Sequence, residues 1–214
     1  MTQPIFNATR TAAVLIALLG AACSAPERSP TLGDANIAGK TVALQVCAAC
    51  HGANGVATSP AFPNLAGQQA TYLEAQLKSF RSHRRSDPKG HEYMWGMSNS
   101  LTDEQITALG EYYASQNPAV MKQLHSPENA VGKAIYEKGI AETGMVACIA
   151  CHGAHAEGNG QFPRLAGQHA DYLIKQLQVF ANTDTRPDGV AMKGIAHALS
   201  AQNMKDVTEY LQSM

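Results

Sequence analysis

The chain has 214 residues, a formal net charge of −1 and 45% hydrophobic residues, a composition typical of a globular protein with one or two domains. Its 16 Lys and Arg residues are matched by 17 Asp and Glu, so it lacks the basic field that a nucleic-acid-binding protein needs. Beyond the N-terminal segment, no apolar run is long enough to span a bilayer. Composition therefore argues against a nucleic-acid-binding protein and against a membrane-spanning domain.

Residues 1–22 have the pattern of an export signal. Arg10 is the only charge ahead of a short apolar run, which is too short for a transmembrane helix. Small residues then lead to Cys23, as in the cleavage box of bacterial lipoproteins. We expect a signal peptide of lipoprotein type, a lipid on Cys23 and a flexible tether over residues 23–34. Ordinary cleavage near Ala22 or Ala25, which would release a soluble periplasmic protein, is the alternative.

The first predicted domain, residues 35–117, opens with apolar residues at helical spacing that lead into the sequence Cys47-Ala-Ala-Cys50-His51. Two thiols at this spacing can reach the two vinyl groups of one porphyrin, and the adjacent histidine then lies under the iron. A zinc knuckle would need two further ligands nearby, and a redox dithiol would need a βαβ setting. The sequence shows neither, so it predicts a c-type haem on Cys47 and Cys50, with His51 as the proximal iron ligand.

The rest of this domain predicts two more helices separated by a long loop. Residues 68–80 place apolar side chains on one flank of a helix. Thr102, with Gln105 three residues later, has the pattern of a capping box and predicts the start of the last helix. No alternating strand pattern is present, and we expect an all-α fold.

The second half of the chain repeats the first. Residues 118–128 are the predicted linker, and residues 129–214 are the second predicted domain. Residues 162–180 match residues 62–80 at twelve of nineteen positions, which indicates two similar domains rather than a solenoid. Ser200 is the expected cap of the final helix.

The second haem motif is Cys148-Ile-Ala-Cys151-His152. It predicts a second covalent haem on Cys148 and Cys151, with His152 as the proximal ligand. One difference between the halves is an extra stretch over residues 139–147, ahead of this motif.

The repeat also selects candidates for the opposite axial position of each iron. Met94 and Met192 occupy equivalent positions, whereas no histidine outside the motifs is repeated. Met97 aligns with Ile195 and is the rival of Met94. A methionine is often a core filler, but repetition at a fixed place favours Met94 and Met192 as ligands. Thioether ligation raises the reduction potential of a haem.

The basic segment from Arg81 to Lys89, which includes Arg84 and Arg85, has three interpretations. It is a docking patch for an acidic partner, a set of charges that pair with haem propionates, or a solvated loop. Trp95 either hydrogen-bonds a propionate or packs in the domain.

Both haem motifs are followed by Phe-Pro-x-Leu-Ala-Gly-Gln, and both methionines lie seven residues before the leucine that opens the terminal helix. With these features the chain resembles, over residues 34–214, the dihaem c4-type cytochromes c of bacterial periplasms. The resemblance implies two tandem class-I cytochrome c domains that face each other with their haems close together. It also implies that the carbonyls of Pro63 and Pro163 accept hydrogen bonds from the proximal histidines, fixing their orientation.

The family's role implies an electron carrier of the respiratory chain that moves electrons between a quinol–cytochrome c oxidoreductase and a terminal oxidase. One alternative is a dihaem redox enzyme of the peroxidase or thiosulfate dehydrogenase type, in which one haem has an open or unusual axial position. Another is a fixed electron-input subunit of a larger redox complex, which the expected lipid anchor would suit.

Overall fold

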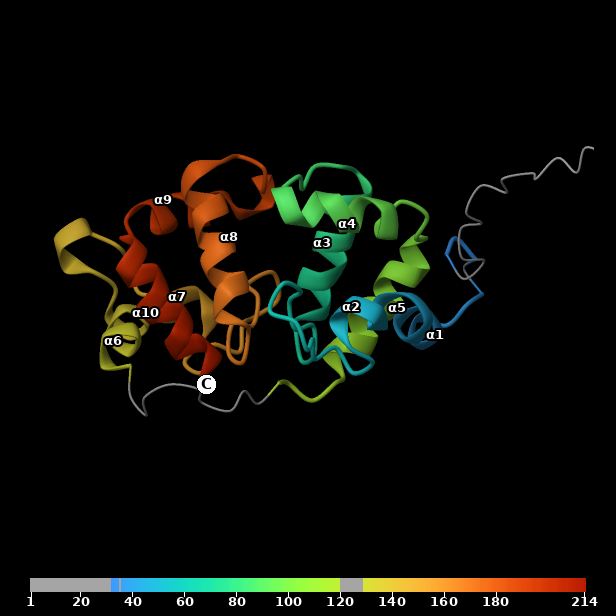
Figure 1. The fold of residues 1–214 in the computed structure, drawn as a ribbon, viewed down its shortest axis with the longest axis horizontal. Coiled ribbons are helices and arrows are strands. Elements are labelled where there is room, and N and C mark those ends of the chain that lie inside the picture. The colour runs from blue at the N-terminus through green and yellow to red at the C-terminus, as the bar shows by residue number, and fades with distance from the viewer. Residues whose placement is uncertain (1–31, 35, 120–128) are drawn as a thin grey trace, which may run out of the picture.

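The computed structural model describes residues 32–34, 36–119 and 129–214. The expected signal peptide, Cys23 and most of the expected linker lie outside these residues. Two helical halves stand side by side along the long axis of the molecule (Figure 1), the first coloured blue to green and the second yellow to red. The prediction of an all-α fold is confirmed, because β pairing among the described residues is limited to two isolated bridges.

Each half contains the same succession of helices. In the first domain α1 (Gly39–Val42) runs through a π-helical turn, η1 (Ala43–Cys47), into α2 (Ala48–His51), and is followed by α3 (Ala70–Arg81), α4 (Pro88–Ser98) and α5 (Asp103–Ala114). The second domain comprises α6 (Ala130–Lys138), η2 (Ala141–Thr143), α7 (Ile149–His152), α8 (Ala170–Asn182), η3 (Pro187–Gly189), α9 (Val190–His197) and α10 (Ala201–Gln212).

The prediction of a long loop before the terminal helix of each domain was wrong, because α4 and α9 lie in these segments. Pro88 occupies the first turn of α4, where its missing N–H costs nothing and its fixed φ suits a helix. The sequence of α4 carries two glycines and no continuous apolar stripe, so its periodicity does not indicate a helix. Both helices pack on their neighbours α3 and α8.

The first and last helices of each domain cross closely at a glycine. A Cβ on Gly39 would lie 2.6 Å from the backbone of Ala108 in α5, and one on Gly132 of α6 would overlap the backbone of Asp206 in α10. The cores form around these crossings, the first including Val42, Ile106 and Leu109 and the second including Ile135, Tyr136, Val207 and Leu211. The N-terminal and C-terminal ends of each domain are thereby held together.

Both predicted caps of the terminal helices are confirmed. Thr102 and Gln105 form a complete capping box at the start of α5. The Ser200 hydroxyl accepts a hydrogen bond from the Asn203 N–H at 3.1 Å and begins α10. Each cap satisfies a backbone donor that the first helical turn leaves without a partner.

The extra stretch in the second domain is a small ordered unit. Gly139, at a φ of 72°, ends α6, and the chain then forms a bridge between Ile140 and Met145 around the turn of η2. Met145 is buried in the domain core. Where the first domain runs from helix to haem motif without a break, the second therefore inserts this turn.

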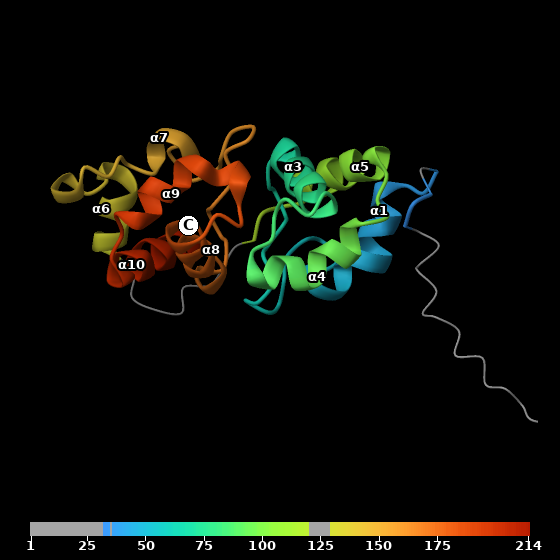
Figure 2. The same cartoon turned by 90° about the horizontal axis from the view of Figure 1, so that it is seen from above.

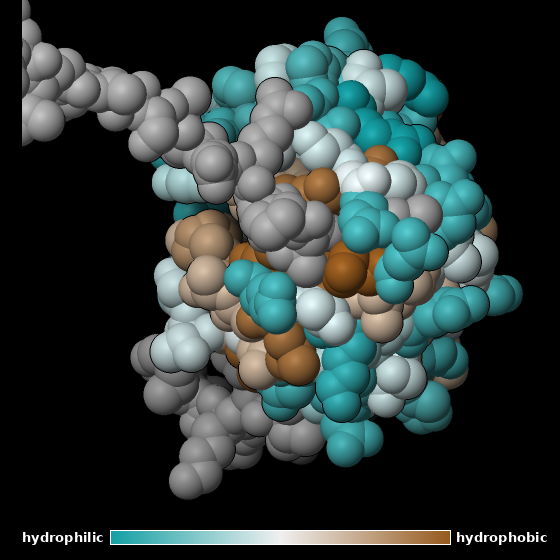
Figure 3. Space-filling view, turned by 90° about the vertical axis from the view of Figure 1, so that its right-hand side faces the viewer, coloured by the Kyte–Doolittle hydropathy of each residue, from teal (hydrophilic) through white to brown (hydrophobic). Residues whose placement is uncertain are grey.

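The two domains meet along α3 and α8, which lie on either side of the boundary in both views (Figures 1 and 2). Ser79 of α3 donates a hydrogen bond of 2.6 Å to Asp188 beside α9, and the Ser86 N–H donates one of 2.8 Å to the Thr185 carbonyl. At the opposite end of the first domain, hydrophobic side chains reach the surface among polar ones (Figure 3).

Candidate functional site

The first Cys-x-x-Cys-His motif spans the junction of η1 and α2. Cys47 ends η1, and Cys50 and His51 follow on the single turn of α2, so the two thiols lie about one helical turn apart. Both thiols are free of disulfides and half-buried. Burial raises the pKa of Cys47 to about 11. His51, in contrast, is only 8% exposed.

The second motif has the same arrangement around α7. Cys148 precedes this helix, and Cys151 and His152 lie on its single turn. Burial raises the pKa of Cys148 to about 11, Cys151 is exposed, and His152 is 6% exposed. Each domain thus presents two thiols and one buried imidazole from a short helix.

Both motif histidines are oriented by a proline carbonyl. His51 Nδ1 lies 2.9 Å from the Pro63 oxygen, and His152 Nδ1 lies 2.9 Å from the Pro163 oxygen. A carbonyl only accepts, so each Nδ1 carries the proton and each Nε2 keeps a lone pair for a metal. Burial lowers the pKa of both histidines, although the carbonyl contact opposes it. The lowered pKa favours the neutral imidazole, which is the form that binds iron.

Met94 and Met192 lie on equivalent helices, α4 and α9, and both are half-buried. Met97, one turn further along α4, is 46% exposed. The Ser98 hydroxyl donates a hydrogen bond of 2.6 Å to the Met94 carbonyl, which ties this turn of α4. Of the two candidates in the first domain, Met94 is the more enclosed.

A largely buried polar cluster occupies the boundary between the domains, and we call it the boundary cluster. Its members are Tyr72, Gln76, Arg85, Asp87, Tyr172, Gln176 and Arg186. The two arginines contribute two positive charges, whereas Asp87 is the only carboxylate among them. Burial raises the pKa of Tyr72, but the two guanidinium groups outweigh it and leave that pKa below its usual value.

The boundary cluster fits a haem, because each haem carries two propionates. Arg85 is paired with Asp87, but Arg186 is half-buried and has no carboxylate partner in the cluster, which is costly. Propionates at this boundary would supply the missing negative charge and accept from guanidinium and phenol groups. These are donors of the kind that carboxylates bind.

The arginines of the basic segment lie in different environments. Arg85 is 5% exposed and belongs to the boundary cluster. Arg84 reaches across the domains to Asp188, with 2.6 Å between Nη2 and Oδ1. Trp95 donates its Nε1–H to the Arg85 carbonyl at 2.8 Å and stacks on His83, so its indole N–H bonds the backbone rather than a propionate.

Two glutamines, Gln68 and Gln168, are important residues that the sequence reasoning missed. Both are 6% exposed and hydrogen-bond the opposite domain, Gln168 to Asn64 and Gln68 to Arg164. They end the repeated Leu-Ala-Gly-Gln, so the repeat itself was the available signal. A repeated polar residue between two buried segments is a candidate for a contact between the repeats.

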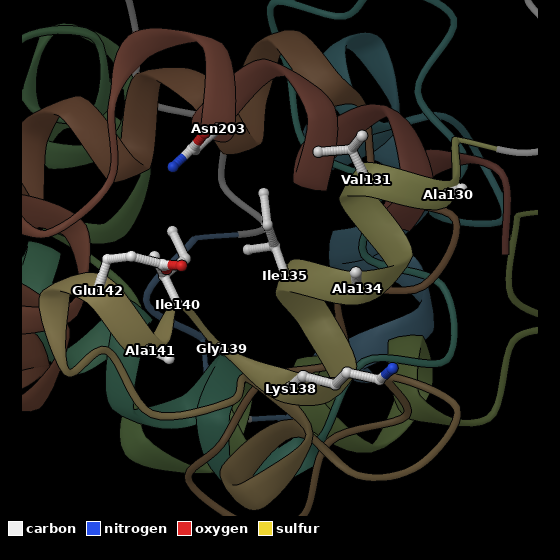
Figure 4. Close-up of a pocket in the computed structure, with 10 residues that line it drawn as sticks. All are labelled: Ala130, Val131, Ala134, Ile135, Lys138, Gly139, Ile140, Ala141, Glu142 and Asn203. Atoms are coloured by element: carbon white, nitrogen blue, oxygen red, sulfur yellow. The ribbon is translucent and has the colours of Figure 1, made fainter.

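An apolar groove lies at the end of the second domain remote from the first (Figure 4). It is bounded by α6, the extra stretch and Asn203 of α10. No residue of either haem motif lines it, and the groove is separate from the candidate iron sites. Within the part of the chain that the structure describes, no helix is long and apolar enough to cross a membrane.

Comparison with known proteins agrees with this geometry. The cytochrome c family profile matches twice, over residues 37–117 and 130–214. Cytochrome c-552 of Acidithiobacillus ferridurans is 39% identical over 192 residues, which cover 89% of this chain and 83% of the relative. The solved structure of Acidithiobacillus ferrooxidans cytochrome c4 is similar with a TM-score of 0.73 and 41% identity, covering 78% of this chain and 98% of that chain.

The name of a further relative states which enzyme gives it electrons. A thiosulfate dehydrogenase electron acceptor of Stutzerimonas stutzeri is 35% identical over 182 residues, which cover 82% of each chain. Two family matches, each containing one Cys-x-x-Cys-His motif, correspond to two covalent haem c groups. The chain belongs to the cytochrome c family and is similar to its dihaem c4-type members, which are electron-transfer proteins.

Proposed function

We propose that this cytochrome carries electrons from a quinol–cytochrome c oxidoreductase to a terminal oxidase through two matched His/Met haems. In the first, Cys47 and Cys50 hold the porphyrin and His51 and Met94 bind the iron. In the second, Cys148 and Cys151 hold it and His152 and Met192 bind the iron. The observation that carries the proposal is the equivalence of the two sites, each with one oriented, neutral imidazole and one half-buried thioether.

The haem and the side chains around it have separate roles. When bound, the haem supplies the one-electron Fe(III)/Fe(II) couple. The proline carbonyls hold the histidine tautomer. Met94 and Met192 would each supply a thioether to one iron, a ligand that an enzyme of the peroxidase type lacks. Arg85 and Arg186 would pair with propionates at the domain boundary.

Redox titration of the purified holoprotein with low-temperature EPR tests this function. We expect two low-spin centres and a near-infrared charge-transfer band from methionine ligation. Both reduction potentials should lie above zero millivolts, because methionine ligation raises the potential of a haem. A high-spin ferric haem in the wild-type protein would favour the enzyme alternative instead.

A second candidate role is electron acceptance from a thiosulfate dehydrogenase. It is supported by the relative named for that role, which matches over 82% of this chain. Stopped-flow reduction of the holoprotein by each purified donor separates the two roles. The faster reduction, measured at equal donor concentration, identifies the donor class, and the same measurement with a terminal oxidase tests the acceptor.

We place the protein in the periplasm, since c-type haem is attached outside the bacterial cytoplasm and residues 1–22 have the pattern of an export signal. A lipid on Cys23 would tether it to a membrane. In that form it would serve a nearby oxidase or act as a fixed input subunit.

A further inference from the structure

Gln68 and Gln168 each clamp one residue of the opposite domain with two hydrogen bonds. The Gln168 Oε1 accepts from the Asn64 N–H at 2.8 Å, and its Nε2 donates to the Asn64 carbonyl at 2.9 Å. In the same way Gln68 accepts from the Arg164 N–H at 2.6 Å and donates to the Arg164 carbonyl at 2.9 Å. The pair of clamps follows the internal repeat of the chain.

The clamped residues directly follow the prolines that orient the haem-motif histidines. One planar peptide group joins Pro63 to Asn64. Its carbonyl accepts from His51, and its N–H donates to Gln168 of the second domain. The peptide group between Pro163 and Arg164 bonds His152 and Gln68 of the first domain in the same way.

Hydrogen bonds at the two ends of one peptide group reinforce each other. Donation from the N–H shifts electron density toward the carbonyl oxygen, which then accepts more strongly from the imidazole Nδ1–H. An imidazole held more strongly at Nδ1 is a more basic ligand at Nε2, and it favours the ferric over the ferrous state. The glutamine side chains are buried, so water does not screen this effect.

We propose that Gln168 and Gln68 are positioning residues that lower the reduction potential of the haem in the opposite domain. The effect is crossed, with Gln168 acting on the haem of His51 and Gln68 on the haem of His152. The domain boundary thereby tunes both electron sites as well as holding them together. This proposal rests on the ligation by His51 and His152 in the proposed function.

The test replaces each glutamine by methionine, which has a similar length and no amide, in the full-length holoprotein. The potential of each haem is measured separately, by following its own NMR-resolved methyl signals through a redox titration. Gln168→Met is expected to raise the reduction equilibrium constant of the first haem by about threefold to tenfold, where tenfold corresponds to ~59 mV for one electron. Gln68→Met is expected to do the same for the second haem.

Gln69→Met is the matched control. Gln69 also hydrogen-bonds the opposite domain, donating to the Glu157 carbonyl at 2.9 Å, but that carbonyl belongs to a peptide group that bonds neither motif imidazole. The Gln69→Met substitution should weaken the contact between the domains without shifting the reduction potential of the haem in the opposite domain. Equal shifts of both haems, no shift in either variant, or the same pattern in Gln69→Met would each overturn the proposal.

Failure of a variant to fold does not remove the test. If Gln168→Met does not accumulate with both haems, Gln168→Asn keeps an amide that is one methylene too short to bridge, and the same crossed shift is expected. If the tuning by Gln68 and Gln168 is wrong but the proposed ligation is right, both haems of the wild-type protein are still low-spin and show the methionine charge-transfer band. A wild-type high-spin centre would instead overturn the proposed ligation, and the crossed tuning with it.

Discussion

Arg85 and Asp87 form a buried ion pair at the domain boundary. The Arg85 Nε lies 2.6 Å from the Asp87 Oδ1, and the two side chains are only 6% and 3% exposed. Asp87 is also the only carboxylate of the boundary cluster, which contains a second guanidinium from Arg186. Its loss therefore leaves two positive charges unpaired by protein.

We expect Asp87→Asn to destabilise the holoprotein by about 3–5 kcal/mol, the usual cost of breaking a buried ion pair from one side. The measurement is urea unfolding at neutral pH. Asp103→Asn is the control, because Asp103 pairs with Arg81 at the surface and its side chain is 68% exposed. A much smaller loss is expected there, since exposed pairs contribute little. Equal losses in the two variants would contradict the assignment.

The same carboxylate predicts a pH dependence. Burial raises the pKa of Asp87, but the Arg85 guanidinium outweighs it, and the pKa in the folded protein lies below its usual value. The folded state then binds the proton less tightly than the unfolded state, whose pKa is about 3.9. The stabilisation is present above that value and is lost as pH falls through the folded pKa. The difference in unfolding free energy between wild type and Asp87→Asn should shrink over that range.

The helix crossings predict a contrast between two kinds of glycine. Gly39→Ala places a Cβ 2.6 Å from the Ala108 backbone, and Gly132→Ala places one against Asp206. Neither neighbour is a flexible side-chain end, so each variant should lose about 1–3 kcal/mol of unfolding free energy. Gly96→Ala in α4 is the control, because no atom outside its chain neighbours and the backbone of its own helix lies within 4 Å of the added Cβ. It should be neutral or gain about 0.5–1 kcal/mol.

The methionine assignment predicts a difference between Met94 and Met97. Met94→Leu removes the methionine sulfur that we propose as a ligand of the first iron. The variant is expected to lose the first haem's contribution to the near-infrared band and to show a high-spin signal. Met97→Leu, at a position that is 46% exposed, should leave both unchanged. Optical and EPR spectra of the two variants decide. A normal band in Met94→Leu would reopen the choice of ligand.

The proposed lipid on Cys23 predicts labelling of the protein by a fatty-acid probe in cells that attach both haems. Cys23→Ser should remove the label and leave the haem content unchanged, because Cys23 belongs to neither motif. Absence of label on the wild-type chain would favour ordinary signal cleavage.

The features that local chemistry dictates were predictable from the sequence. The spacing of Cys47, Cys50 and His51 requires one short helical turn, and Thr102 and Ser200 start helices through hydrogen bonds within three residues. The repeat extended these inferences to the second domain. Local patterns were therefore sufficient for the all-α fold and for both caps.

The features that depend on the partner domain were not predictable in this way. Arg85 belongs to a run of charged residues that local composition cannot distinguish from a solvated loop. Its guanidinium also contacts Tyr172 and Gln176 of α8 in the second domain, and no local pattern indicates these contacts. The helix α4 has no continuous apolar stripe in its sequence, so hydrophobic periodicity does not indicate it. The peptide contacts of Gln68 and Gln168 join residues about one hundred positions apart.

The contacts of Gln68 and Gln168 are those of an isologous interface, in which one surface meets its own copy across a two-fold axis, as in a homodimer. In a homodimer any substitution appears on both sides at once. Joined in a single chain, the two copies are free to diverge. The clamped position is Asn64 in one half and Arg164 in the other. Because both copies lie in one chain, a substitution can change the surroundings of one haem site without changing the equivalent residue at the other.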